Sequence, residues 1–245
     1  MDSGMNNETL VMTATFRPAM DTPGLLVCGE QERMLQYLCA LVSWARADRV
    51  RRIVFCENGA TKFDFSRVVQ YLEAAGKDVE ILVFDGNKDV GRFGKGYGEG
   101  EILEHVCTHS RLLQASPSFY KVTGRLFVSN FDALSLATLT VDAFQRKQPK
   151  DERPRPRKVV TTFFKCSVAL FESRLVHAYK EVDDRQGVFI EHVYYNQLRD
   201  IDLPNFSIKP TLVGQQASTG RVYAEYEEHV IATAQALMNG TAIRT

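Results

Sequence analysis

Residues Gly94–Asp132 have the sequence GKGYGEGEILEHVCTHSRLLQASPSFYKVTGRLFVSNFD. They predict a glycine-rich turn, an amphipathic helix, a basic turn and an apolar strand that ends at Asn130 and Asp132. A flexible backbone before a helix N-terminus suits a phosphate, because free amide groups and the helix dipole both favour negative charge there. Open α/β sheets bind ligands at the carboxyl ends of their strands. The segment therefore predicts a site for a nucleotide-type ligand.

Strands and helices alternate through the first half of the chain. Apolar periodicity predicts strands at 10–16, 51–56 and 79–84, and helices at 30–44, 66–75 and 99–113. Units of this length imply parallel strands joined by right-handed crossovers. We expect an α/β fold, a single Rossmann-like domain whose mostly parallel central sheet is flanked by helices. The strand 125–129 should return through that sheet and place Asn130 and Asp132 beside the loops that contain Glu57, Asn58 and Asp85.

The composition is that of a globular protein with one large core. The chain has 245 residues, of which 44% are hydrophobic and 24% are charged, so we expect one domain over residues 1–245. Its 30 basic residues balance 30 acidic ones, which excludes a protein that mainly coats nucleic acid. Its 5 cysteines form no C-x-x-C pair and are expected to be small core residues in a reducing compartment.

Two segments are expected to lie outside the packed fold. Residues 1–9 are polar, and we expect them to be disordered. Residues 145–158, QRKQPKDERPRPRK, predict a mobile basic loop that could contact an anionic membrane surface or a lipid-linked acceptor, or have no partner at all. The chain lacks an apolar run of about 18 residues and a signal-peptide core, so we expect a cytoplasmic protein without an integral membrane span.

Several short motifs occur in a recognisable order, namely Cys56-Glu57-Asn58, Asp85-Gly86-Asn87, Lys95-Gly96-Tyr97-Gly98-Glu99 and Lys121-Val122-Thr123-Gly124-Arg125. This order resembles bacterial GT-A-type glycosyltransferases, in particular surface-polysaccharide transferases. The resemblance covers about residues 10–200. It implies a GT-A domain, a nucleotide-sugar donor, and a glycan or lipid-linked glycan acceptor.

The resemblance also implies roles for the residues of these motifs. Glu57, Asn58 and Asp85 would face the nucleoside, and Lys95 and Gly96 would form a turn against phosphate. The alternatives are an ordinary turn at Glu57-Asn58, since Asn-Gly favours turns, and a plain glycine loop at Lys95-Gly96.

The diphosphate and the sugar would lie at the next strand. Lys121, Arg125, Asn130 and Asp132 would face them, although Asp132 could instead cap the helix that follows. Typical GT-A enzymes carry Asp-x-Asp where this chain has Asn130-Phe131-Asp132. One carboxylate is a poor match for Mg²⁺ or Mn²⁺. Either Asp132 holds such a metal, or Lys95, Lys121 or Arg125 neutralises the leaving group instead.

Glu191 lies inside a strongly apolar and aromatic run. A carboxylate in such surroundings can act as a general base, which sugar transfer with inversion needs for the acceptor hydroxyl. The alternative is a carboxylate on a helix surface, paired with Lys180 or Arg199.

Two other functions remain compatible with this sequence. A nucleotidyltransferase on a related sheet would release pyrophosphate rather than a nucleoside diphosphate. A catalytically inactive domain could bind a sugar nucleotide or a partner protein without turnover. Fold alone does not decide among them.

Overall fold

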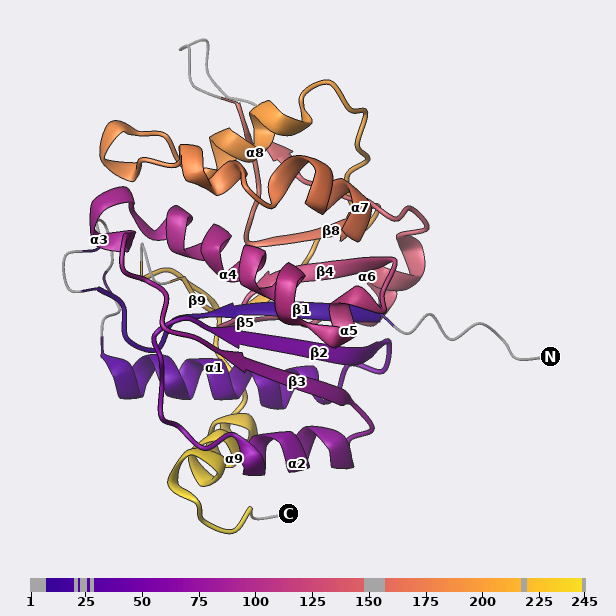
Figure 1. The fold of residues 1–245 in the computed structure, drawn as a ribbon. Coiled ribbons are helices and arrows are strands. Elements are labelled where there is room, and N and C mark those ends of the chain that lie inside the picture. The colour runs from indigo at the N-terminus through magenta and orange to yellow at the C-terminus, as the bar shows by residue number, and fades with distance from the viewer. Residues whose placement is uncertain are drawn as a thin grey trace.

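The computed structural model describes residues 8–19, 22, 26, 29–147, 157–216 and 220–243. Its largest sheet has five strands in the order β3-β2-β1-β4-β8 (Figure 1). These are β1 (Glu8–Ala14), β2 (Val50–Glu57), β3 (Asp78–Val83), β4 (Ser118–Thr123) and β8 (Phe163–Ser167). The first four run parallel, and β8 pairs antiparallel with β4. The predicted α/β class with a mostly parallel central sheet is confirmed.

Five shorter strands lie outside this sheet. A second, antiparallel sheet has the order β10-β9-β5, formed by β5 (Leu126–Val128), β9 (Leu212–Gln215) and β10 (Val222–Ala224). The remaining two, β6 (Arg146–Lys147) and β7 (Lys158–Val159), pair with each other.

Helices cover both faces of the central sheet (Figure 1). On one face lie α1 (Glu30–Trp44), α2 (Ser66–Ala74) and α9 (Glu228–Asn239). On the other lie α4 (Lys95–His109), α5 (Arg111–Gln114) and α8 (Ile190–Leu198). Short helices connect them: α3 (Val90–Phe93), α6 (Phe131–Ala137), α7 (Val168–Leu170), a π-helical turn at Phe171–Leu175, and 3₁₀ turns at Ala178–Glu181 and Asp184–Gln186.

The strand sequences explain this two-faced core. Side chains alternate between the faces of a strand. In β1, Leu10 and Met12 therefore pack against α1, whereas Val11 packs on the α4 side. All three are fully buried. A strand covered on both faces needs a continuous apolar run, and burying each such side chain stabilises the fold by about 1.5–3 kcal/mol.

The helix predicted at 30–44 is confirmed at both ends, but two predictions about mobile segments are wrong in part. Residues 1–7 lie outside the described residues, yet Glu8 and Thr9 belong to β1. Glu8 is tolerated in a buried strand because Ser135 Oγ donates to its Oε1 (3.0 Å). Residues 148–156 of the basic stretch also lie outside the described residues, whereas the two ends of that stretch pair as β6 and β7.

The predicted strand at 125–129 is the main error in the fold. The central strand is β4, which contains Lys121, and the chain leaves the sheet after Thr123. β5 then joins the second sheet beside β9. The basic residue made 118–123 look like a turn, although its neighbours Phe119, Tyr120 and Val122 are all buried.

Candidate functional site

A cleft of about 350 Å³ opens over the carboxyl ends of β1 and β4. Its polar lining comes from both sides of the central sheet and includes Thr13 and Thr15 from the end of β1, Arg33 from α1, Lys95 and Glu99 from α4, Thr123 and Arg125 from the end of β4, Lys158 from β7, Asp184 from the 3₁₀ turn before α8, and Glu191 and His192 from α8. Gly96, Ile102, Phe189 and Ile190 are among its other residues. Of the predicted site residues, the cleft therefore unites Lys95, Gly96, Arg125 and Glu191.

The exit of β4 places Arg125 under this cleft. The backbone amide of Gly124 donates to the carbonyl of Thr13 (3.0 Å), and a Cβ at Gly124 would come within 2.6 Å of that oxygen. Only glycine allows the two backbones to approach so closely. The carbonyl of Arg125 in turn accepts a hydrogen bond from the hydroxyl of Tyr226 (2.8 Å). The backbone at this strand end is therefore held from both sides.

Two buried guanidinium groups line the cleft. Arg125 is 3% exposed and Arg33 is 4% exposed. Arg125 Nη1 donates to Gln36 Oε1 (3.0 Å), but its Nε has no hydrogen-bond partner. Arg33 Nε donates to the carbonyl of Thr15 (2.8 Å), and its Nη2 donates to the hydroxyl of Tyr37 (3.2 Å). Burial lowers the pKa of Arg125, Tyr37 opposes this shift, and the charge of Arg33 adds to it.

Lys121 does not line the cleft but lies beneath it. Its side chain is fully buried, and its ammonium group pairs with Glu99 and donates to the carbonyl of Thr161 (2.7 Å). Burial lowers the pKa of Lys121 to about 7, and the charge of Glu191 opposes this shift. Lys121 therefore positions the Glu99 carboxylate, which does line the cleft.

The glycine-rich stretch forms helix rather than a loop. Lys95 and Gly96 are the first residues of α4, and Gly94 before them has a left-handed φ of 102°. A Cβ at Gly94 would overlap the carboxyl group of Asp184. Burial raises the pKa of Asp184, while the charge of Lys95 and the backbone amides of Gly96 and Lys95 oppose this shift. A carboxylate from the chain itself thus occupies the helix N-terminus where we predicted a phosphate.

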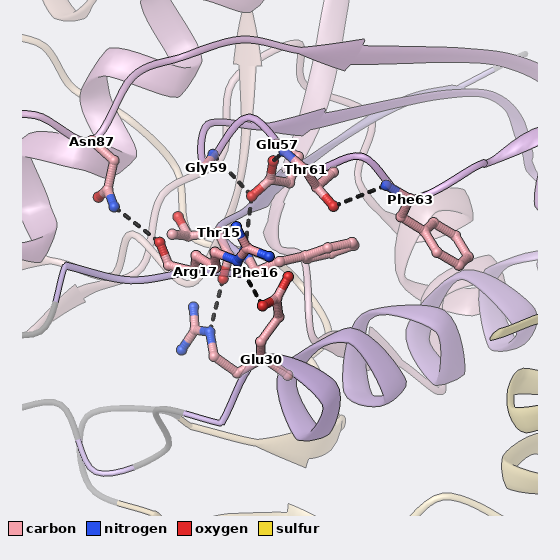
Figure 2. Close-up of polar contacts among 10 residues, drawn as sticks. Thr15, Phe16, Arg17, Glu30, Glu57, Gly59, Thr61, Phe63 and Asn87 are labelled. Atoms are coloured by element: carbon pink, nitrogen blue, oxygen red, sulfur yellow. Dashed lines mark hydrogen bonds and ion pairs between the residues drawn. The ribbon is translucent and has the colours of Figure 1, made fainter. Parts of the chain in front are cut away.

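Glu57 holds loops together at the same edge of the sheet (Figure 2), and the neighbouring Asn58 also bonds to one of them. The Glu57 carboxylate accepts from three backbone amides, those of Phe16 (2.8 Å), Gly59 (2.9 Å) and Thr61 (3.1 Å). Asn58 Oδ1 accepts from the hydroxyl of Thr15 (2.6 Å). Both side chains are fully buried, and neither lines the cleft.

Asp85 is exposed and also lies outside the cleft. Its carboxylate pairs with the ammonium group of Lys88 (2.9 Å). Its backbone forms an isolated antiparallel bridge with Gly59.

Asn130 and Asp132 lie away from the cleft, which corrects their predicted placement. The Asp132 carboxylate accepts from the backbone amides of Asp48 (3.1 Å) and Arg49 (2.9 Å). Those residues precede β2, so Asp132 lies at the amino edge of the sheet, opposite the cleft. The Asn130 side chain bonds to the backbone of Lys209 and Thr211, and Asp132 does not cap its own helix. The error follows from the departure of β5 from the central sheet.

Glu191 lies in the first turn of α8 and faces the cleft. The alternative pairing with Lys180 or Arg199 is wrong, because Lys180 contacts Glu104 (3.4 Å) and no ion pair joins Glu191 to either cation in the described part of the chain.

Comparison with known proteins identifies the architecture. No protein-family model and no curated protein matches the sequence. Similar solved structures include the glycosyltransferase GlyE of Streptococcus pneumoniae TIGR4, with a TM-score of 0.51 and 10% identity over 82% of this chain and 45% of that one. An active-site mutant of LgtC has a TM-score of 0.52 and 11% identity, over 80% of this chain and 72% of the LgtC chain. The bifunctional glycosyltransferase WbbM has a TM-score of 0.50 and 10% identity, over 82% of this chain and 39% of the WbbM chain.

The chain has a GT-A-type fold. It spans less than half the length of the GlyE and WbbM chains. Among the residues that the structure describes, no helix combines the length and the apolar character needed to cross a membrane.

The residues of this GT-A-type chain do not fit a Mg²⁺ or Mn²⁺ ion. The exit of β4 carries Thr123, Gly124 and Arg125, none of which is a carboxylate. Glu99 pairs with Lys121, and Asp132 lies at the opposite edge. Across the described ranges, no three His, Cys, Asp or Glu side chains are grouped so that they could hold a metal ion. Three carboxylates, those of Glu99, Asp184 and Glu191, do line the cleft, but they are not grouped as the ligands of one hard cation would be.

Sequence reasoning missed Arg33, Glu99 and Asp184 as cleft residues. Arg33 precedes Tyr37 by one helical turn on the buried side of α1, and a cation on an otherwise apolar face was a usable signal. Glu99 stands in one of the motifs that carried the family resemblance, but nothing in the spacing of Glu99 or Asp184 places them at the cleft.

Proposed function

We propose that this protein is a glycosyltransferase, which moves a sugar from a nucleotide-diphosphate sugar to a glycan or lipid-linked glycan acceptor. One observation carries the proposal: a single cleft at the carboxyl edge of the sheet combines the cations of Arg33, Lys95 and Arg125 with the carboxylates of Glu99 and Glu191. Guanidinium and ammonium groups complement a diphosphate, and carboxylates accept hydrogen bonds from sugar hydroxyls. The GT-A-type fold supports the same conclusion.

The reaction needs charge stabilisation and positioning. The bond from the anomeric carbon to the diphosphate oxygen breaks, and the oxygen of the acceptor hydroxyl forms the new bond to that carbon. Cations at the cleft stabilise the charge that develops on the departing nucleoside diphosphate, and the walls of the cleft hold donor and acceptor in place. In an inverting reaction Glu191 takes the proton of the acceptor hydroxyl.

Glu191 is the better base of the two cleft carboxylates. The carboxylate of Glu99 is already engaged by the buried side chain of Lys121, so it is less free to take the proton of an acceptor hydroxyl. Within the described residues no hydrogen bond or ion pair engages the Glu191 carboxylate, and its position in the first turn of α8 leaves it facing the cleft. Glu99 is the candidate for binding sugar hydroxyls.

The test begins with a panel of UDP-, GDP- and dTDP-sugars, measured by thermal shift. We expect at least one of them to raise the melting temperature, and addition of glycan acceptors to release the matching nucleoside diphosphate. Release of pyrophosphate from a nucleoside triphosphate and a sugar phosphate would identify a nucleotidyltransferase instead. A thermal shift without turnover on any acceptor would identify a binding protein.

Glu191→Gln tests the assigned base. It should lower kcat by about 10²–10⁴-fold while donor binding is retained, because only the proton acceptor is lost. Glu228→Gln is the matched control, since Glu228 also lies in the first turn of a helix, α9, on the other face of the sheet. Equal activities of the two variants would remove Glu191 from the mechanism.

A further inference from the structure

Arg125 is a buried charge whose hydrogen-bonding capacity is only partly used by the residues that the structure describes. Its Nη1 donates to the neutral amide of Gln36, and its Nε has no partner. The Gln36 amide supplies no negative charge, and among the described residues no carboxylate is one of the main groups that shift the pKa of Arg125. Burial of a cation without an anion costs several kcal/mol in general, and an anionic ligand at this position would offset that cost.

Arg33 places a second positive charge next to the first. The charge of Arg33 contributes to the lowered pKa of Arg125, so the two guanidinium groups repel each other across the cleft. Arg33 is held by the carbonyl of Thr15 and the hydroxyl of Tyr37, and Arg125 stands over the same Tyr37 ring, with 5.6 Å from Cζ to the ring centroid. A dianionic ligand between them would relieve this repulsion.

The position of Arg125 is built into the backbone rather than left to a flexible side chain. Gly124 packs against the end of β1, and the residue that faces the carbonyl of Arg125 from β9 is Gly214, where a Cβ would also overlap this carbonyl. Gly214 has a left-handed φ of 106°, which favours glycine. Two glycines and the Tyr226 hydroxyl therefore fix the strand exit from which this guanidinium group projects.

We propose that Arg125 and Arg33 bind the diphosphate of the donor directly, in place of a divalent cation. This inference rests on the proposed function and goes beyond it. The Nε–H and Nη2–H groups on one edge of a guanidinium form a fork that matches two phosphate oxygens, and in Arg125 the Nε of this edge is the donor without a partner. The carboxylates that a metal would require are absent from the exit of β4.

The guanidinium pair would also serve the chemical step. When the bond from the anomeric carbon to oxygen breaks, its electron pair stays on the terminal phosphate oxygen of the nucleoside diphosphate. The two fixed positive charges stabilise this oxygen without any rearrangement of solvent. The acceptor proton goes to Glu191, so the charges balance without a metal ion.

The test measures binding of UDP, GDP, dTDP and inorganic pyrophosphate by calorimetry, once in EDTA and once in Mn²⁺. We expect at least one of these diphosphates to bind with dissociation constants that agree within about threefold between the two conditions. Arg125→Lys should weaken that binding about 10- to 100-fold, because lysine keeps the charge and loses the fork.

Arg146→Lys is the matched control. Arg146 also has a buried Nε without a partner, but its Nη2 donates to the carbonyls of Leu198 (3.0 Å) and Ile201 (2.6 Å), away from the cleft. This variant should bind diphosphates as the unaltered protein does. Equal weakening in both variants would mean that the loss comes from damage to the fold, and would overturn the assignment of Arg125.

The failures of the two proposals are distinguishable. Binding of a nucleoside diphosphate in Mn²⁺ but not in EDTA would overturn the inference and leave the proposed function intact. Absence of binding for every diphosphate and every sugar nucleotide in both conditions would overturn the proposed function as well. The comparison of EDTA with Mn²⁺ uses the unaltered protein and decides the question even where Arg125→Lys does not fold.

Discussion

The carboxyl ends of β2 and β4 flank β1 in the same sheet, and both carry a buried charged side chain. At β2, three backbone amides satisfy the carboxylate of Glu57. At β4, among the residues that the structure describes, Arg125 keeps a donor without a partner and no carboxylate is found beside it. Buried polar groups in folded chains are nearly always hydrogen-bonded. If Arg125 binds a diphosphate as proposed, a charged residue at a strand end indicates a ligand where the described chain leaves that residue unsatisfied.

The largest effect, on the stability of the fold, is expected at the carboxyl end of β2, where backbone amides satisfy the carboxylate of Glu57. Glu57→Ala removes the acceptor of three buried amides and should lower the free energy of unfolding by about 4 kcal/mol, since each unsatisfied group costs about 1–3 kcal/mol. Urea denaturation measures this loss, and Glu57→Gln, which keeps one acceptor oxygen, should lose less. Diphosphate affinity of the folded fraction should not change. A loss of affinity with unchanged stability would place Glu57 at the ligand and break the comparison.

Arg125→Met should lower diphosphate affinity and leave stability nearly unchanged, which is the opposite of the result expected for Glu57→Ala. Replacing a buried charge that has no carboxylate partner by an apolar side chain is often neutral or stabilising, so the free energy of unfolding should change by no more than about 1 kcal/mol. Diphosphate binding should weaken about 100-fold, because the whole guanidinium group is lost. Parallel denaturation and calorimetry on this variant and on Glu57→Ala test the contrast directly. A stability loss as large as that of Glu57→Ala would make Arg125 a structural residue.

The same contrast explains what the sequence could predict. Regular apolar spacing located the helix at 30–44 correctly, because periodicity records which face is buried. It failed at β4, where Lys121 interrupts a buried strand and is accommodated by Glu99 and the carbonyl of Thr161, which belong to other segments. It also could not separate Glu57 from Arg125. Whether a buried charge is satisfied depends on partners from distant segments, which no local pattern contains.

Lys121 lies between the two cases, buried like Glu57 and close to the cleft like Arg125. Burial lowers its pKa to about 7 in the folded chain, whereas the pKa of a lysine in an unfolded chain is about 10.4. Between these pH values the unfolded chain binds the extra proton, so the contribution of Lys121 to stability becomes more favourable as the pH rises.

Lys121→Met removes this titration. The free energy of unfolding of the unaltered protein, minus that of the variant, should therefore rise from pH 7 to pH 10, by at most about 1.4 kcal/mol per pH unit. Denaturation series at several pH values measure this difference, in which the other titrating groups cancel. A difference independent of pH would mean that the Lys121–Glu99 pair stays charged throughout this range.

The smallest effect is expected at Asp132, on the edge opposite the cleft. Its carboxylate accepts from the amides of Asp48 and Arg49, the second of these at 2.9 Å, and holds the turn before β2. Asp132→Asn keeps one acceptor oxygen, so the free energy of unfolding should fall by only about 1 kcal/mol. Sugar transfer and its response to Mn²⁺ should not change, because Asp132 lies outside the cleft at the carboxyl edge. If the variant instead lost activity and Mn²⁺ restored it, the edge of the sheet that carries Asp132 would take part in catalysis. The unpartnered donor of Arg125 at the exit of β4 would then not be sufficient to locate the site.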